Sequence, residues 1–119
     1  MQYTTYWLQK IADQKAANRI LAAKARSDIE KITHVLVNNF NAQKIILFGS
    51  LVKGKFSDRS DIDLAVAGIA KRDFFAALGE VNQLTQFWVD LKPLEDLEPH
   101  FLHRVLTTGE IIYERNISP

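Results

Sequence analysis

The sequence predicts an α/β fold, in which helices cover a β-sheet, and three observations support this. Apolar residues recur at three- and four-residue steps through the first 40 residues, which is the helical period. Short runs of strand length follow at 44–48, 61–66, 87–91 and 110–114. Helical patterns separate the later runs, so helices and strands alternate. The 119 residues suit a single domain, with 1–40 an N-terminal helical segment and 41–119 the core.

The segment at 1–40 contains no glycine or proline, so nothing in it ends a helix outright. Its apolar positions at helical spacing include Leu8, Ile11, Ile29, Ile32, Leu36 and Phe40. Ser27 followed by Glu30 fits a capping box, which would start a new helix there. The segment is therefore either one long helix or two helices that meet near Ser27.

The run at 44–48, KIILF, is apolar throughout and suits a buried strand. The run DIDLAV alternates, so Asp61 and Asp63 share one strand face while the apolar residues at 62, 64 and 66 point to the core. FWVDL repeats this arrangement, because Asp90 shares a face with Trp88.

Two further helices complete the pattern. Residues 71–86 have apolar side chains at helical spacing, which predicts a helix between the second and third strands. Pro99 suits the first turn of a final helix, and Gly109 suits its C-terminal cap. The run EIIYE at 110–114 then predicts a fourth strand.

Composition excludes several classes of protein. The formal net charge is only +1, which argues against a nucleic-acid binder held by phosphate contacts, so we expect no direct nucleic-acid binding. Cysteine is absent, which excludes disulfides and thiolate metal sites. No apolar run reaches membrane-spanning length and no signal peptide is evident, so we expect a cytoplasmic protein without membrane contact.

The paired carboxylates are the first chemical signal. Asp61 and Asp63 repel each other on one strand face, and burying them unpaired is costly, so they need a cation. Oxygen ligands favour a hard ion, and Mg²⁺ takes one or two protein carboxylates and fills its other positions with water and phosphate. The pattern therefore favours a magnesium–phosphate site.

Gly49 and Ser50 supply the phosphate side of this site. Gly49 allows a ligand to approach the backbone, and Ser50 can cap a short helix beginning at Leu51, whose amides then face an anion. Lys53 and Lys55 add positive charge. These features suit metal-assisted transfer of a phosphorus-centred group.

The pair Gly49–Ser50, ten intervening residues and then Asp61-Ile62-Asp63 resemble the GS-x10-DxD signature of the minimal nucleotidyltransferase (MNT) family of the polymerase β superfamily. ILFGSLVKGKFSDRSDIDLAV, VDLKPLED and GEIIYER also resemble family segments, so the likeness covers roughly residues 30–115. It implies the polymerase β-like fold, with a small mixed sheet covered by helices.

The resemblance also implies roles for individual residues. Asp61, Asp63 and Asp90 match the three carboxylates that act in catalysis and hold two Mg²⁺ ions. Gly49 and Ser50 match the turn that binds the phosphates of ATP. Beside that turn, Lys53 stands where many relatives have arginine, and Lys55 is the second cation that we assign to nucleotide binding.

MNT proteins are paired with HEPN-domain ribonuclease toxins and act as antitoxins by transferring AMP from ATP to a toxin tyrosine. The resemblance therefore implies a protein adenylyltransferase with a HEPN-domain partner in a hetero-oligomer. Two alternatives stay open: an antitoxin that neutralises its partner by docking alone, and a nucleotidyltransferase that modifies small molecules such as antibiotics. A template-free polymerase is opposed by length and net charge.

Other polar residues have ordinary structural explanations. Asp58 suits a solvent-facing loop, His100 with His103 lacks a third metal ligand, and Trp88 suits packing better than adenine stacking. The basic residues of the first helical segment suit either a solvated face or a surface that docks a partner or steers ATP; they are Lys10, Lys15, Arg19, Lys24, Arg26 and Lys31.

Overall fold

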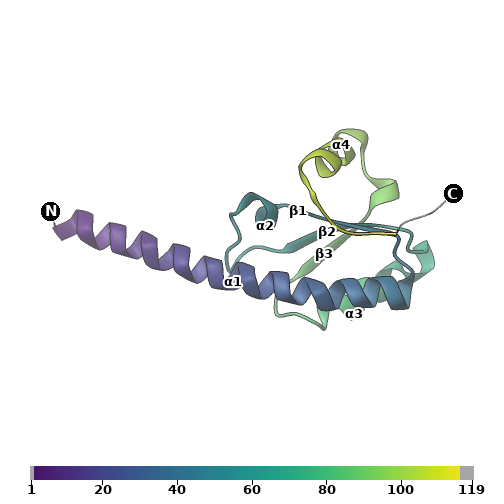
Figure 1. Ribbon diagram of the computed structural model, residues 1–119, viewed down its shortest axis with the longest axis horizontal. Helices are drawn as coiled ribbons and strands as arrows, with labels where there is room; N and C mark the ends of the chain where they lie inside the picture. The colour runs from purple at the N-terminus through teal and green to yellow at the C-terminus, as the bar shows by residue number, and fades with distance from the viewer. Residues whose placement is uncertain (1, 116–119) are drawn as a thin grey trace.

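The computed structural model describes residues 2–115 (Figure 1). The elements follow in the order α1 (Gln2–Phe40), β1 (Lys44–Phe48), α2 (Ser50–Lys53), β2 (Ile62–Ala67), η1 (Lys71–Asp73), α3 (Phe74–Asn82), β3 (Val89–Pro93), η2 (Leu94–Asp96), α4 (Pro99–Thr108) and β4 (Glu110–Glu114). The alternation of helices and strands that the sequence predicts is confirmed.

The four strands form one mixed sheet in the order β3-β2-β1-β4. Strand β1 is antiparallel to both β2 and β4, whereas β2 and β3 run parallel. The β1–β4 register shifts between Ile45 and Ile46, which is a bulge or similar irregularity. This mixed sheet is the one that the resemblance implies.

Helices cover both faces of the sheet (Figure 1). The larger core cluster packs the second half of α1 and helix α3 against one face, through residues such as Ile32, Leu64 and Val81. A smaller cluster packs α4 against the other face, where Ile46, Ala65 and Val105 are buried. The sheet is therefore the middle of three layers.

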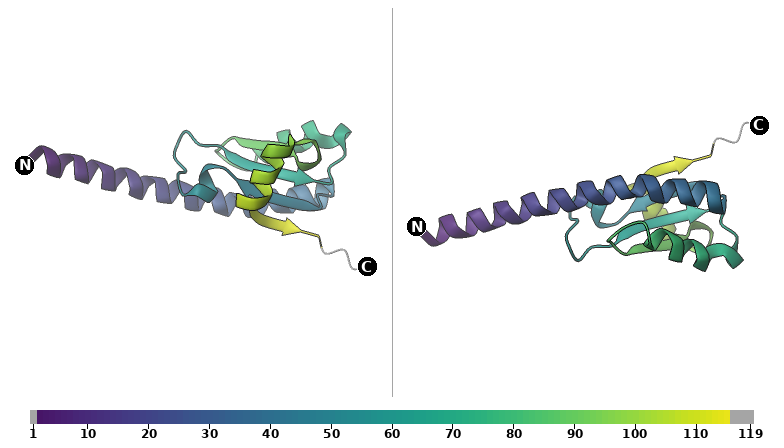
Figure 2. Two further views of the ribbon diagram at one scale, coloured as in Figure 1. Left: turned by 90° about the horizontal axis from the view of Figure 1, so that it is seen from above. Right: turned by 90° about the horizontal axis from the view of Figure 1, so that it is seen from below.

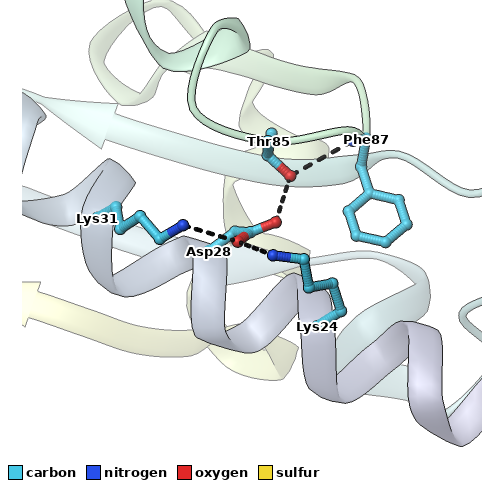
Figure 3. A network of polar contacts seen from close by, with 5 residues as sticks. All are labelled: Lys24, Asp28, Lys31, Thr85 and Phe87. Atoms are coloured by element: carbon cyan, nitrogen blue, oxygen red, sulfur yellow. Dashed lines mark hydrogen bonds and ion pairs between the residues drawn. The ribbon is translucent and has the colours of Figure 1, made fainter.

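Helix α1 is one continuous helix, so no second helix starts near Ser27. Figure 3 shows a contact that anchors this region: the buried Asp28 binds a loop that lies far away in sequence. Thr85 Oγ1 donates to Asp28 Oδ2 at 2.6 Å, and Lys24 and Lys31 lie 3.1 and 3.4 Å from Oδ1. These contacts fix the middle of α1 to the connection between α3 and β3.

The carboxyl group of Asp28 is ionised at neutral pH in spite of its burial. Burial by itself raises the pKa of Asp28, but the hydrogen bonds from Thr85 and Lys24 and the charge of Lys24, together with Lys31, hold the pKa below its usual value. The contribution of Asp28 to stability is therefore complete above its unfolded pKa and is lost as the pH falls through its folded pKa.

The N-terminal half of α1 extends beyond the sheet (Figures 1 and 2). The molecule measures 64 × 30 × 25 Å, and a helix of 39 residues accounts for most of its long axis, at about 1.5 Å per residue. Within residues 2–115, no helix is both long enough and apolar enough to span a membrane.

Several element boundaries differ from those that the sequence predicts. Strand β2 covers Ile62–Ala67 and not 61–66, so Asp61 lies just before it. The helix expected over 71–86 is a 3-10 turn followed by α3, which ends at Asn82. There the Asn82 side chain donates to Leu78 O at 2.9 Å and to Val89 O at 3.1 Å, so it ties the helix end to the next strand. Strand β3 begins at Val89, because Phe87 instead packs on Phe56 with ring centroids 5.1 Å apart.

Gly109 follows α4 as predicted, but for a different reason. Its φ is −76°, so it is not in the left-handed conformation typical of glycine caps. A Cβ at this position would collide with Val105 O and Ile46 Cγ2. Glycine is therefore needed because α4 approaches β1 closely at this point.

Candidate active site

The structure places Asp63 and Asp90 side by side. They occupy register-matched positions on the parallel strands β2 and β3, so their side chains leave the sheet on the same face. Asp61 lies immediately before β2, on the same side by strand alternation, and its side chain is exposed. Asp63 and Asp90 therefore lie together on one face of the sheet, as the alternation in the sequence predicts, and the charge of Asp61 is close enough to affect the pKa of Asp63.

Gly49 lies opposite Asp63 at the end of β1, where Phe48 pairs with Asp63. Its φ of +81° and ψ of −149° form a conformation that glycine adopts readily and other residues avoid. A Cβ on Gly49 would overlap the Asp63 carboxylate oxygen Oδ2. Glycine is therefore favoured at position 49 for two reasons. The backbone conformation of the turn suits glycine, and the carboxylate of Asp63 fills the space that a side chain would occupy.

The carboxylates disturb one another electrostatically. Partial burial, followed by the negative charges of Asp90 and Asp61, raises the pKa of Asp63 to about 6. Lys92 and Lys53 oppose this shift. Lys92 Nζ also lies 3.1 Å from Asp90 Oδ2, so one lysine partly neutralises the pair. The pKa of Asp63 stays raised in spite of the two lysines, so the negative charge of the carboxylates is not fully offset. Such an excess of negative charge is typical of a site that holds a cation.

The turn after β1 differs from the sequence prediction in one detail. Helix α2 begins at Ser50 itself and its N-cap is Gly49, with no side-chain capping hydrogen bond. Ser50 is therefore not the cap residue, because the glycine conformation already turns the chain into the helix. The amides of the first turn of a helix lack partners within it, so the backbone here can still receive an anion.

A cavity of about 290 Å³ opens beside this turn. Its walls come from the end of β1, from α2 and from α4, with Gly49, Lys53 and Arg104 among the lining residues. The Arg104 guanidinium carbon lies 5.6 Å from the centre of the Phe101 ring, which also lines the cavity. An aromatic ring and two cations thus surround a space next to Gly49.

Sequence reasoning missed Arg104, Phe101 and Asn82. On a helical pattern, an arginine is expected on the solvated face and a phenylalanine in the core, so only the packing of α4 over β1 reveals the cavity. Asn82 Oδ1 accepts the Val89 amide at 2.7 Å and thereby holds the strand that presents Asp90. No spacing in the sequence connects Asn82 with β3.

Of the remaining candidate site residues, one lines this cavity and the others do not. Lys53 lines the cavity, whereas the exposed Lys55 is not among its lining residues. Asp58, His100 and His103 are exposed. Trp88 is also exposed, and its backbone carbonyl accepts the Ile62 amide at 2.8 Å, next to the strand residues that present the carboxylates.

The donor chemistry fits Mg²⁺. Within the described residues, no three acidic or histidine side chains are grouped closely enough to form a metal cage by themselves. Mg²⁺ does not require one, since it usually binds one or two carboxylates and completes its octahedron with water and substrate phosphate. Asp63, whose ionised form is disfavoured by its neighbours, is the side chain that a divalent cation would stabilise most.

Known proteins share this fold and part of this sequence. A Methanocaldococcus jannaschii protein, MJ1547, assigned as a protein adenylyltransferase, is 26% identical over 69 residues, which is 58% of this chain. The match spans about half of that relative, 53% of its length.

Two solved structures of toxin–antitoxin complexes contain a similar chain. One is a variant of the MntA–HpeT complex, with 26% identity, a TM-score of 0.62, and coverage of 73% of this chain and 72% of that chain. The other is a toxin–antitoxin complex with AMP-PNP, with 25% identity, a TM-score of 0.62, and coverage of 76% and 73%.

The family model described as polymerase beta, nucleotidyltransferase matches residues 30–118. This range contains the Gly49–Ser50 turn, the three carboxylates and all four strands. With the match spanning well over half of the chain, the protein belongs to the polymerase β nucleotidyltransferase family.

Proposed function

We propose that this protein is a Mg²⁺-dependent adenylyltransferase that transfers AMP from ATP to a protein hydroxyl. The acceptor is a tyrosine of a HEPN-domain ribonuclease toxin, and the transfer makes this chain the antitoxin. The observation that supports this best is the register of Asp63 beside Asp90, opposite the Gly49 turn. This arrangement brings metal-type ligands and an anion-binding turn to one place.

In this proposal Asp61 and Asp63 hold both metal ions, and Asp90 completes the second site. When bound, Mg²⁺ neutralises the charge that develops on the phosphates. The backbone amides after Gly49 bind the β and γ phosphates, and Lys53 and Lys55 add positive charge. Arg104, across the cavity from Lys53, is a further cation available to the triphosphate.

The chemical step is a displacement at the α phosphorus. The acceptor oxygen forms the new bond, the bond to the bridging oxygen breaks, and pyrophosphate leaves. In this proposal Asp90 accepts the proton of the acceptor hydroxyl, and Asn82 assists by holding β3 in place. The products are an AMP ester and pyrophosphate.

The partner is supported by the relatives. MJ1547 is assigned to protein adenylylation, and the MntA–HpeT and AMP-PNP structures are toxin–antitoxin complexes. An AMP phosphate placed near an RNA-cleaving site would repel RNA, which explains how the transfer would silence a toxin. We place this reaction in the cytoplasm, where ATP and the toxin meet.

The test uses the purified protein with ATP, Mg²⁺ and a purified HEPN-domain ribonuclease toxin from the same organism. Intact mass spectrometry should show the toxin heavier by one or more AMP units, with its ribonuclease activity lost. Asp63→Asn and excess chelator should each abolish the mass change. If the mass never changes, yet a variant with both Asp61→Asn and Asp63→Asn still protects cells, the antitoxin acts by docking alone.

A further inference from the structure

The face of α1 that packs on the sheet continues beyond the sheet. Leu8, Lys15, Ala22 and Ile29 follow one another at seven-residue steps, a spacing that drifts only about 20° around a helix per step. Ile29 is buried in the core, whereas Leu8 at the other end of this row is 63% exposed. The side of α1 that faces the core is therefore exposed to solvent where the helix extends beyond the sheet.

The exposed end of this face is strongly apolar. Trp7 and Ile11 lie beside Leu8 and are 56% and 52% exposed. The Trp7 ring packs edge-to-face on Tyr6 at 5.2 Å, and Lys10 Nζ lies 5.9 Å from the Trp7 ring centre. Large apolar groups gathered on a projecting helix are typical of a surface that binds another molecule.

The same part of α1 is positively charged. Residues 4–20 contain Lys10, Lys15 and Arg19 against the single carboxylate Asp13, a net charge of +2. Two copies of this segment would repel each other, so a second copy of the chain is a poor occupant. A partner that presents carboxylates beside apolar side chains is complementary.

A cavity lies between α1 and the segment around α2, and it has a volume of about 330 Å³. The buried side chains of Leu51 and Phe56 contribute apolar walls, and Lys15 and Arg19 also line it. Leu51 belongs to α2, the short helix that follows the Gly49–Ser50 turn, so the cavity and the turn share this helix.

The cavity favours a protein over a nucleic acid. Its apolar walls suit one apolar or aromatic side chain, while its cations suit flanking carboxylates, and a phosphate backbone offers no apolar group of this kind. The family model matches residues 30–118, so the projecting half of α1 lies outside the matched range.

We propose that Trp7, Leu8, Ile11, Lys15 and Arg19, with the Leu51–Phe56 cavity, form the docking surface for the protein acceptor. The acceptor contributes an acidic segment with an apolar side chain that enters the cavity. This proposal rests on the proposed adenylyltransferase function, since it names how the acceptor is held beside the site. In this proposal, the exposed N-terminal half of α1 binds the acceptor.

The test compares two surface variants with two matched controls. The first variant combines Trp7→Ala, Leu8→Ala and Ile11→Ala, and its control is Ile20→Ala, an exposed apolar residue on the opposite side of the same helix. The second combines Lys15→Glu and Arg19→Glu, and its control combines Lys71→Glu and Arg72→Glu, two exposed cations on η1.

Each variant is titrated calorimetrically with MgATP and with a purified HEPN-domain ribonuclease toxin from the same organism. Both surface variants should bind that protein more weakly, on the order of tenfold or more, while MgATP binding and both controls stay at wild-type values. In the transfer assay, KM for the protein acceptor should rise and kcat at saturation should be unchanged.

Several outcomes overturn the docking surface. Wild-type affinity in both surface variants does so, as does a wild-type protein that does not bind the HEPN-domain protein. Light scattering that shows a dimer lost in the apolar variant would assign the surface to a second copy. Binding to anionic vesicles or to single-stranded RNA in place of the protein would assign it to a membrane or to nucleic acid. Strong protein binding without AMP transfer would instead refute the proposed function and leave the docking surface standing.

Discussion

Gly49 is the residue on which the proposed site depends most closely. Its φ is positive and a Cβ at this position would overlap the Asp63 carboxylate, so any side chain there disturbs both the turn and Asp63. The sequence predicts a glycine that lets phosphate approach. The structure adds that the same glycine makes room for the carboxylate of Asp63.

Replacing Gly49 by Ala should therefore reduce AMP transfer by orders of magnitude, because the new Cβ pushes Asp63 out of place. The loss of activity should be larger than the fall in melting temperature accounts for. The affinity for MgATP should also fall. Gly54→Ala is the matched control, since Gly54 also has a positive φ of 70° but a Cβ there meets nothing within 4 Å. Equal losses in both variants would show that only backbone strain matters.

The raised pKa of Asp63 predicts how stability depends on pH. Because its folded pKa of about 6 lies above its ordinary value of 3.8, the folded state binds this proton more tightly than the unfolded state does. In metal-free buffer, the Asp63 contribution to the free energy of unfolding should therefore fall as pH rises from about 4 to about 6, and stay low above that. Mg²⁺ with a non-hydrolysable ATP analogue should restore stability at pH 7.

Thermal unfolding of wild type and Asp63→Asn across this pH range checks the prediction. The difference in melting temperature between the two proteins should shift in favour of the variant as pH rises in chelator. It should shift back towards the wild type in Mg²⁺ with the analogue. A difference that does not change with pH would mean that Asp63 titrates normally.

At the scale of elements, the side chain of Asp28 attaches α1 to a distant segment of the chain by a hydrogen bond. It joins the helix to the loop before β3 through Thr85, and two lysines on its own helix neutralise it. This contact brings together residues 57 positions apart. It also explains why Ser27 lies inside a helix, since residues on both sides of it pack on the same sheet.

Asp28→Asn should lower the free energy of unfolding by about 2 kcal/mol at pH 7, because a buried hydrogen bond to a charged group is lost or weakened. The folded pKa of Asp28 lies below the unfolded one, so its contribution is complete above the unfolded pKa and disappears as pH falls through the folded pKa. Urea unfolding should therefore show a smaller difference between variant and wild type at pH 3. Asp13→Asn, on the exposed part of α1, should change little at either pH.

At the scale of the whole molecule, the two halves of α1 differ in stability. Residues such as Ala25, Ile32 and Leu36 are fully buried, whereas the residues around 7–20 are mostly exposed. A helix without tertiary contacts is marginally stable in water when it is shorter than about 12–15 residues, and the projecting part is near that limit.

Hydrogen exchange should separate the two halves. Amides at 6–18 should exchange orders of magnitude faster than amides at 28–38, because the first group opens without unfolding the core. Adding the docking partner should slow exchange at 6–18 while leaving the core amides unchanged. Uniform protection along α1 in the free protein would show that the helix is stable without a partner.

The sequence by itself determined the order of helices and strands and which strand face holds the carboxylates, because alternation and periodicity are local properties of the chain. The bounds of β2 and β3 differ by one or two residues from the predicted ones. It also placed Gly49–Ser50 and Asp61–Asp63 at a spacing typical of one family. Lys53 and Asp90 were also predicted from the sequence. Lys53 follows the Gly49–Ser50 turn by a few residues, and Asp90 lies within a predicted strand.

Only the tertiary structure decided how those elements meet. The register of Asp63 with Asp90, the contact between Gly49 and Asp63, and the cavity with Arg104 all join segments that are distant in the sequence. The continuity of α1 through Ser27 was decided in the same way, because packing of Ala25 and Ile29 and the Asp28–Thr85 bond outweigh a local capping signal. A capping box stabilises a helix end by about 1 kcal/mol, whereas burial of a single large apolar side chain contributes about 1.5–3 kcal/mol. Long-range packing therefore prevails wherever it competes with such a signal.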